Sequence, residues 1–182
     1  MSKAGYEYLL AYKITVSIYD LTKQFCDKYI DPKSRTHDQM VQAARSGMQN
    51  IAEGHKHVSL KGYIYLTGIA MGSLEELLND YLSYARQNNI SILSATEAKT
   101  QIREIRAIWD IIRANPYLPN LPGFPNLPDS PYLAVNLMLT LVNQANYLIG
   151  KLNTSLQEKH MKEGGLTERL YRKRIEYRSR NN

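Results

Sequence analysis

Cysteine and long apolar runs are both scarce in this sequence of 182 residues. Cys26 is the only cysteine, so no disulfide can form within the chain, and we expect a reducing compartment. The N-terminal region has no apolar run of signal-peptide length, and the most apolar segment, 133–142, is short and interrupted by Asn136. We therefore expect a soluble cytoplasmic protein with no membrane partner.

The sequence also lacks the motifs of common enzyme chemistries. A di-metal carboxylate site in a helical bundle needs Glu-x-x-His on two helices, and this motif does not occur. Glycine-rich phosphate loops and a recognisable serine-histidine-aspartate set are absent too. Glu53, His55 and His57 lie close in sequence, but we expect Gly54 to end a helix between them, which favours a solvated loop over a metal site. The sequence thus predicts no enzyme, no metal and no cofactor.

Charge is unevenly distributed along the chain. The 23 Lys and Arg residues exceed the 17 Asp and Glu residues, which gives a formal net charge of +6. Residues 158–182 hold eight Lys or Arg and four Asp or Glu, so most of the excess lies in this segment. A basic excess suits an anionic partner such as nucleic acid, although a moderate one supports solubility equally well.

Apolar residues recur at steps of three and four in the first 113 residues, which predicts amphipathic helices. The predicted helices cover residues 6–29, 34–54, 59–87 and 94–113. Ser59 is the expected cap of the third helix, and Ser94 stands three residues before Glu97, which is the spacing of a capping box. Such helices with short connections predict an all-α fold, an antiparallel up-down-up-down four-helix bundle over residues 1–115.

Glycines predict how the second and third helices meet. Glycine within a helix costs about 1 kcal/mol relative to alanine, so close backbone approach is the expected compensation. Gly47, together with neighbouring alanines, gives the second helix a slim face. Gly68 and Gly72 lie one turn apart and are predicted to supply the matching face of the third helix.

Prolines then recur at a strict period of three, which is the repeat of polyproline II. They are Pro116, Pro119, Pro122, Pro125, Pro128 and Pro131. A second face of this repeat carries Leu118, Leu121, Phe124 and Leu127, which we expect to pack against the helices. The sequence predicts a strut over residues 116–131 that spans roughly 50 Å at about 3.1 Å per residue. A ligand for a proline-recognition domain is the alternative, but the strut uses more of the pattern.

The last segment, 132–182, is predicted as a C-terminal helical extension with a basic tail. Apolar residues keep the helical spacing from 131 to about 162, and Gly164-Gly165 breaks this long helix. A final basic helix is expected from Leu166 to about Tyr177. Whether the long helix packs on its own subunit or on a neighbour is left open by the sequence.

Three motifs in the first part of the chain resemble a known family. They are Gln42-Ala43-Ala44-Arg45-Ser46, Asn50-Ile51-Ala52-Glu53-Gly54 and Gly72-Ser73-Leu74-Glu75. Over residues 6 to about 113 the chain resembles the four-helix bundle proteins encoded in intervening sequences of large-subunit ribosomal RNA genes. The resemblance implies their architecture and names no reaction.

Three further motifs resemble the four-helix suffix domain that follows this bundle in a subset of the family. They are Asn143-Gln144-Ala145-Asn146-Tyr147-Leu148, Glu163-Gly164-Gly165 and Glu168-Arg169-Leu170. More loosely, the chain is similar to the accessory variability proteins of diversity-generating retroelements, which form pentameric rings and bind a reverse transcriptase and nucleic acid. This resemblance implies a homo-oligomer, with a pentamer favoured, and RNA or a reverse-transcriptase-type nucleoprotein as partner.

Arg45, Asn50 and Glu53 form the most distinctive polar group, on a helix that otherwise packs tightly. A catalytic role would need a nucleophile or a paired carboxylate aimed at a pocket, and Glu75 and Glu76 are the only evident candidates. A hydrogen-bonded network that fixes helix register or a subunit interface needs neither. We therefore interpret the group as a structural polar network.

Two clusters of basic residues are candidate nucleic-acid sites. The first is Lys99, Arg103, Arg106 and Arg113, predicted on one side of the fourth helix. The second is Arg169, Arg172, Lys173, Arg174, Arg178 and Arg180, beside Tyr171 and Tyr177. Such spacing suits phosphate contacts, with tyrosine for base stacking. For the first cluster a solvated helix face is an equally good interpretation, and for the second we favour nucleic acid.

The leading functional hypothesis is a non-enzymatic oligomeric helical-bundle protein that binds RNA or a nucleoprotein partner through these clustered basic residues. The alternative is a protein–protein assembly factor without nucleic-acid binding, in which the long C-terminal helix and the strut present the binding surface.

Overall fold

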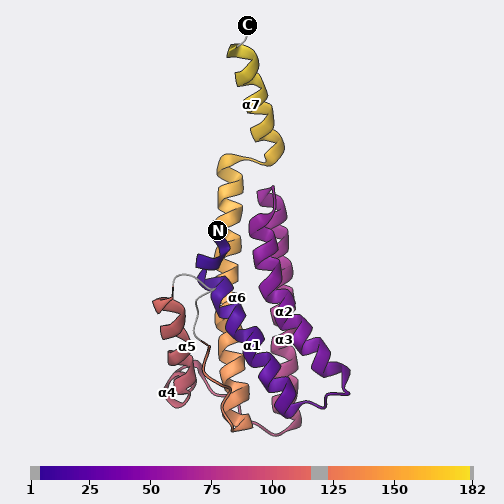
Figure 1. The fold of residues 1–182 in the computed structure, drawn as a ribbon, viewed down its shortest axis with the longest axis vertical. Coiled ribbons are helices and arrows are strands. Elements are labelled where there is room, and N and C mark those ends of the chain that lie inside the picture. Colours follow the sequence, from indigo (N-terminus) through magenta and orange to yellow (C-terminus); the bar gives the residue numbers. More distant parts are fainter. Residues whose placement is uncertain (1–4, 116–122, 181–182) are drawn as a thin grey trace.

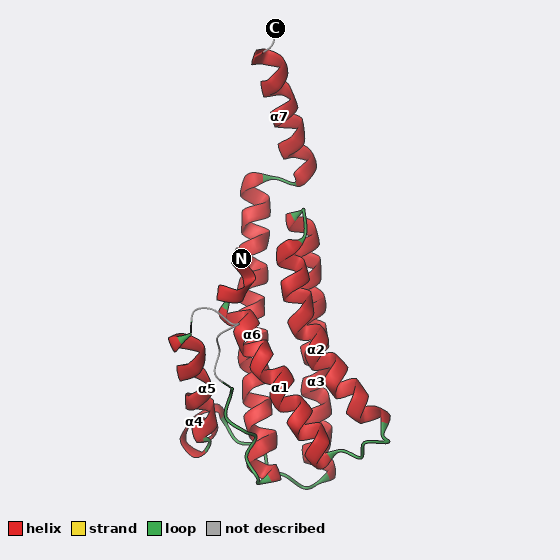
Figure 2. Cartoon of the chain, in the orientation of Figure 1, coloured by secondary structure: helices red, strands yellow, loops and turns green. Residues whose placement is uncertain are grey.

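The computed structural model describes residues 5–115 and 123–180, and these residues form an all-α fold without strands (Figure 2). In chain order the elements are the 3-10 helix η1 (Gly5–Tyr8), α1 (Leu10–Tyr29), α2 (Arg35–Lys56), α3 (Leu60–Gln87), α4 (Ala95–Gln101), α5 (Arg103–Ala114), α6 (Pro131–Glu163) and α7 (Leu166–Arg180). None of the described helices is both long enough and apolar enough to cross a membrane.

Four long helices, α1, α2, α3 and α6, supply most of the apolar core, and we call them the core helices (Figure 1). The segment of α4 and α5 adds Ala98, Ile102, Ile105, Ile108 and Ile112 to the same core. α2 packs against α1 and α3, and α6 packs against α3 and α1. Two polar contacts show that α3 and α6 run in opposite directions. Asn153 donates to the carbonyl of Ile64 at 2.9 Å, whereas Asn146, earlier on α6, donates to Glu75, later on α3, at 3.3 Å.

The structure differs from the sequence prediction in the fourth of these helices. The sequence predicted the helix 94–113 as the fourth helix beside α1, α2 and α3. In the structure α6 is the fourth core helix, and the segment 94–113 packs outside these four. The reason is the composition of α6, in which every residue from Ala134 to Leu139 is buried, as are Leu141 and Val142. A helix that is apolar on all sides must be surrounded by other elements. The segment predicted as an extension therefore supplies a core helix, and it packs on its own chain.

The predicted helix 94–113 is two helices, α4 and α5, separated at Ile102. The backbone of Ile102 is extended, with φ −110° and ψ 95°, and its side chain is fully buried. Lys13 of α1 holds the far end of α5, because its Nζ donates to the carbonyls of Ile112 at 2.9 Å and Asn115 at 3.3 Å. Burial lowers the pKa of Lys13. α4 and α5 thus form a separately anchored wall beside α1 and α6.

The predicted helix caps are confirmed. The side-chain oxygen of Ser59 accepts from the backbone N–H of Gly62 at 3.1 Å. Ser94 and Glu97 make both bonds of a capping box, and the bonds from Ser94 hold the pKa of Glu97 below its usual value. The predicted end of α2 at Gly54 is wrong, because α2 continues to Lys56.

The described part of the predicted strut lies against the core. Leu127 is buried, and its backbone N–H donates to the side chain of Gln24 on α1 at 2.9 Å. Phe124 is partly buried against the same core. Residues 123–128 have no helix, while Leu118 and Leu121 lie outside the described residues.

The predicted role of the glycines on α3 is wrong. A Cβ atom added at Gly68 or at Gly72 would meet nothing within 4 Å, so both glycines lie on an open face of α3. The close approach is made instead by a glycine of α2 with a large side chain of α3. A Cβ atom added at Gly47 would lie 2.7 Å from a methyl carbon of Leu74, which is fully buried.

Alanine substitutions at two glycines should therefore have opposite effects on the free energy of unfolding. Gly72→Ala should stabilise the folded chain by about 0.5 to 1 kcal/mol, because alanine is the better helix former and the added methyl group meets nothing within the chain. Gly47→Ala should destabilise the protein by about 1 kcal/mol, because the cost of overpacking against Leu74 exceeds the gain in helix propensity. Urea denaturation of both variants measures the difference, and a Gly47→Ala protein as stable as Gly72→Ala would contradict this packing.

Candidate functional site

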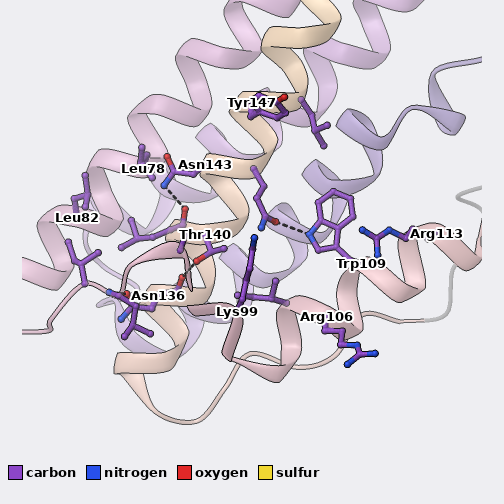
Figure 3. Close-up of a pocket in the computed structure, with 17 residues that line it drawn as sticks. Leu78, Leu82, Lys99, Arg106, Trp109, Arg113, Asn136, Thr140, Asn143 and Tyr147 are labelled. Carbon is purple, nitrogen blue, oxygen red and sulfur yellow. Dashed lines mark hydrogen bonds between the residues drawn. The ribbon is translucent and has the colours of Figure 1, made fainter. Parts of the chain in front are cut away.

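A groove of about 950 Å³ lies between α3, α6 and the wall formed by α4 and α5 (Figure 3). We call it the α5–α6 groove. Most of its lining is apolar, and the larger apolar side chains are Leu78, Leu82, Leu93, Leu139, Leu148 and Trp109. A concave apolar surface with a few fixed polar groups is the usual form of a binding site.

Asn136, which interrupts the apolar run 133–142, fixes one end of the groove. Its side chain is 2% exposed. It accepts from the backbone N–H of Leu93 at 2.8 Å and donates to the carbonyl of Ser91 at 3.0 Å. These bonds tie the connection between α3 and α4 to α6. The groove wall is therefore held in place by the core.

Trp109 of α5 fixes the other end of the wall. Its indole N–H donates to the side-chain oxygen of Gln144 on α6 at 2.8 Å (Figure 3). The guanidinium of Arg113 lies 5.6 Å from the centre of the Trp109 ring, within the range of a cation–π contact. Trp109 is partly buried against the core, and it also lines the groove.

Three of the four basic residues predicted on the fourth helix line the groove, namely Lys99, Arg106 and Arg113. Arg103 does not, because it lies at the start of α5 after the break at Ile102. Its side chain pairs with Glu104 at 3.0 Å and lines a smaller cavity of about 520 Å³ beside residues 125–129. The structure thus brings together three of these residues and separates the fourth.

Among the described residues, no Asp or Glu side chain lines the groove. Asp110 lies 3.9 Å from Arg106, outside the groove lining, and both side chains are largely exposed. An exposed pair at this distance contributes little stability and leaves the positive charge available. The groove is therefore apolar inside and basic along its α4–α5 side.

The second predicted basic cluster lies on α7, which extends beyond the ends of the core helices (Figure 1). Every residue from Leu170 to Arg180 is exposed. Gly164, with φ 75°, joins α6 to α7 and confirms the predicted break. Arg172 donates to the carbonyl of Glu163 at 2.6 Å, and the carboxylate of Glu168 accepts from the N–H of Gly165, so both helices are joined by local bonds.

Within the chain, Arg45, Asn50 and Glu53 do not form one network, and the predicted contact of this group with a neighbouring subunit stays a prediction. Arg45 and Glu53 are exposed, and no hydrogen bond joins the three residues. Asn50 instead donates to the side-chain oxygen of Ser46 at 2.9 Å, and Ser46 bonds the hydroxyl of Ser73 on α3 at 2.9 Å. The hydrogen bond between α2 and α3 is therefore made by Ser46 and Ser73, which belong to two of the motifs that resemble the family.

The histidines near the end of α2 have separate neighbours. The His55 ring lies between Tyr6 and Tyr63, with centroid distances of 5.9 and 5.8 Å. His57 accepts from the backbone N–H of Ser59 at 3.2 Å. Among the described residues, no group of three His, Cys, Asp or Glu side chains is placed to hold a metal ion.

Comparison with known proteins adds one finding. A family model described as 23S rRNA-intervening sequence protein matches residues 7–110. The chain belongs to this family. Comparisons with curated proteins and with solved structures gave no match. The residues matched to the intervening sequence protein family end within α5, so α6 and α7 lie outside the match and the groove is built from both parts.

Removing the Asn136 side chain should test how firmly the groove is anchored. Asn136→Ala leaves the N–H of Leu93 and the carbonyl of Ser91 without their partner, which should lower the free energy of unfolding by about 1 to 3 kcal/mol. Asn143→Ala is the matched control, because that exposed amide bonds only the carbonyl of Leu139 on its own helix. Equal urea midpoints for the two variants would contradict the anchoring role.

Proposed function

We propose that this intervening sequence protein is a non-enzymatic oligomeric helical protein that binds RNA through α7. The observation that carries the proposal is the exposure of α7, which holds the six basic residues of the second cluster and only two acidic ones, Glu168 and Glu176. Lys and Arg side chains on one exposed helix bind phosphates and release counterions from the nucleic acid.

Two aromatic side chains on α7 favour a single-stranded RNA as the ligand. Tyr171 and Tyr177 are 65% and 70% exposed and lie among the basic residues. Bases of a single strand stack on such rings, and each stacked base contributes about 1 to 3 kcal/mol. The name of the family refers to 23S rRNA, which is our reason for proposing RNA rather than DNA.

The core helices form the scaffold of this proposal. We infer that α1, α2, α3 and α6 make an antiparallel four-helix bundle and that several bundles assemble into a homo-oligomer, with a pentamer favoured by the resemblance described above. Tyr65 and Ile69 are exposed on the open face of α3 that carries Gly68 and Gly72, which supports a contact between subunits. In a ring, several α7 helices would meet one RNA, and avidity would raise the affinity.

A nucleoprotein such as a reverse transcriptase with its RNA is a partner of the same chemical kind. An assembly factor that binds only proteins is the alternative function, and the apolar α5–α6 groove is the observation that favours it. Salt-dependent RNA binding separates the two.

Neutralising three basic residues of α7 should weaken RNA binding. For the variant Lys173→Gln, Arg174→Gln and Arg178→Gln, the slope of log affinity against log salt should fall by about 2, because each phosphate contact with a single strand contributes roughly 0.7. At 0.1 M salt the affinity should fall roughly a hundredfold by the same relation. Fluorescence anisotropy with a single-stranded RNA at several salt concentrations measures both quantities.

The control variant is Arg35→Gln, Lys56→Gln and Lys61→Gln, which removes the same net charge from exposed positions on α2 and α3. It should keep most of the affinity and slope. Equal losses in the two triple variants would mean that net charge alone attracts the RNA. No RNA binding by the wild-type protein at low salt would favour the protein-only function.

The mass of the assembly is a separate prediction. Light scattering after size-exclusion chromatography should give a multiple of 20.9 kDa, with five copies favoured. Ile69→Arg should reduce this mass if the open face of α3 is the contact, because a buried arginine without a partner opposes association. A wild-type monomer at every concentration tested would contradict the proposed oligomer.

A further inference from the structure

The α5–α6 groove has the features of a protein-binding surface distinct from α7. Leu82, Ile92 and Tyr147 line it and are 36%, 56% and 65% exposed. Figure 3 shows Leu82 on the α3 side and Trp109 on the α5 side, with α6 between them. Contiguous apolar side chains that remain open to solvent mark interaction sites.

The charge of the groove selects the occupant. Lys99, Arg106 and Arg113 come from α4 and α5. No carboxylate among the described residues lines the groove, and Asp110, 3.9 Å from Arg106, lies outside it. Complementary charge on a partner would therefore be negative, and it would lie beside the apolar surface.

An amphipathic helix fits this combination better than nucleic acid does. The floor and the α3 side are mainly aliphatic, from Leu78, Leu139 and Leu148, and aliphatic side chains cannot pair with the polar edges of bases. A helix docks by placing residues at spacings of three and four into an apolar groove between helices. The volume of about 950 Å³ is at the upper end for small-molecule pockets, which also favours a polypeptide.

A basic helix is the wrong partner for this surface. α7 of a second copy would bring Arg172, Lys173 and Arg174 towards Lys99 and Arg106, and like charges at an interface oppose binding. The walls are already fixed by Asn136 and by the bond between Trp109 and Gln144, so docking needs no rearrangement of the backbone.

We propose that the α5–α6 groove binds an amphipathic helix of a partner protein, with aliphatic residues in the groove and acidic residues beside Lys99, Arg106 and Arg113. This surface is separate from the RNA-binding helix α7, so the protein would hold an acidic protein partner and an RNA at different places.

The probe for this proposal is a fluorescein-labelled helical peptide of about 16 residues, or roughly four to five turns, with leucine at helical spacing and glutamate at the flanking positions. Its control carries lysine in place of every glutamate. Anisotropy titration with the full-length protein should show binding of the acidic peptide and at least tenfold weaker binding of the lysine peptide. Comparable binding of both peptides would overturn the charge selection, and no binding of the acidic peptide would overturn the proposal.

Two variants on α5 locate the binding site. Arg106→Glu should weaken acidic-peptide binding at least tenfold, because Arg106 lines the groove. Arg103→Glu changes the same charge three residues away, outside the groove, and should bind the peptide as the wild type does. Equal losses in both variants would overturn the assignment to the groove.

Leu82→Gln tests the apolar side and leaves the charge unchanged. This variant should also bind the acidic peptide at least tenfold more weakly. Because Leu82 is exposed, the urea midpoint of the variant should stay near that of the wild type. If a single-stranded RNA, and not the peptide, lost affinity in Arg106→Glu and Leu82→Gln, the groove would be a nucleic-acid site and the proposal would be wrong. The triple variant of α7 should bind the peptide normally, so failure of the RNA proposal is distinguishable from failure of this one.

Discussion

The burial of α6 is the constraint on which the rest of the structure depends. From Ala134 to Val142 nearly every side chain is buried, so this helix has to be covered on more than one side. α1 and α3 cover it from the core, and α4 and α5 cover part of the remainder. These two helices have seven and twelve residues against 33 in α6, so their cover is partial. The α5–α6 groove is the apolar surface that they leave open beside α3.

α6 also connects the two surfaces for which we propose partners. Its N-terminal half forms the floor of the groove, and its C-terminal end carries α7 beyond the core helices (Figure 1). The basic residues divide between the α4–α5 wall and α7, while the bonds of Asn136 and Gln144 keep the wall fixed to α6. The helix α6 thus sets the positions of both the α5–α6 groove and α7.

Local sequence signals predicted part of the candidate site. The basic residues of α7 and the break at Gly164 follow from composition and from the preference of glycine for positive φ. Lys99, Arg106 and Arg113 were identified as a cluster, but their apolar neighbours were not, because Leu78, Leu82 and Leu148 come from helices that are distant in sequence. For the bonds that tie the groove wall to α6, the sequence offered one signal, which is the polar residue Asn136 inside an apolar run.

The sequence by itself determined the all-α class, the helix caps at Ser59 and Ser94, and most helix boundaries, because periodicity and capping depend on residues within a few turns of one another. Only the tertiary structure decided which helix completes the core and which glycine permits close packing. Helix 94–113 and α6 both have apolar stripes, and the choice between them depends on how much surface each buries against α1 and α3. Gly47 and Gly72 are both glycines within helices. Only Gly47 is required for packing, because a side chain there would collide with Leu74.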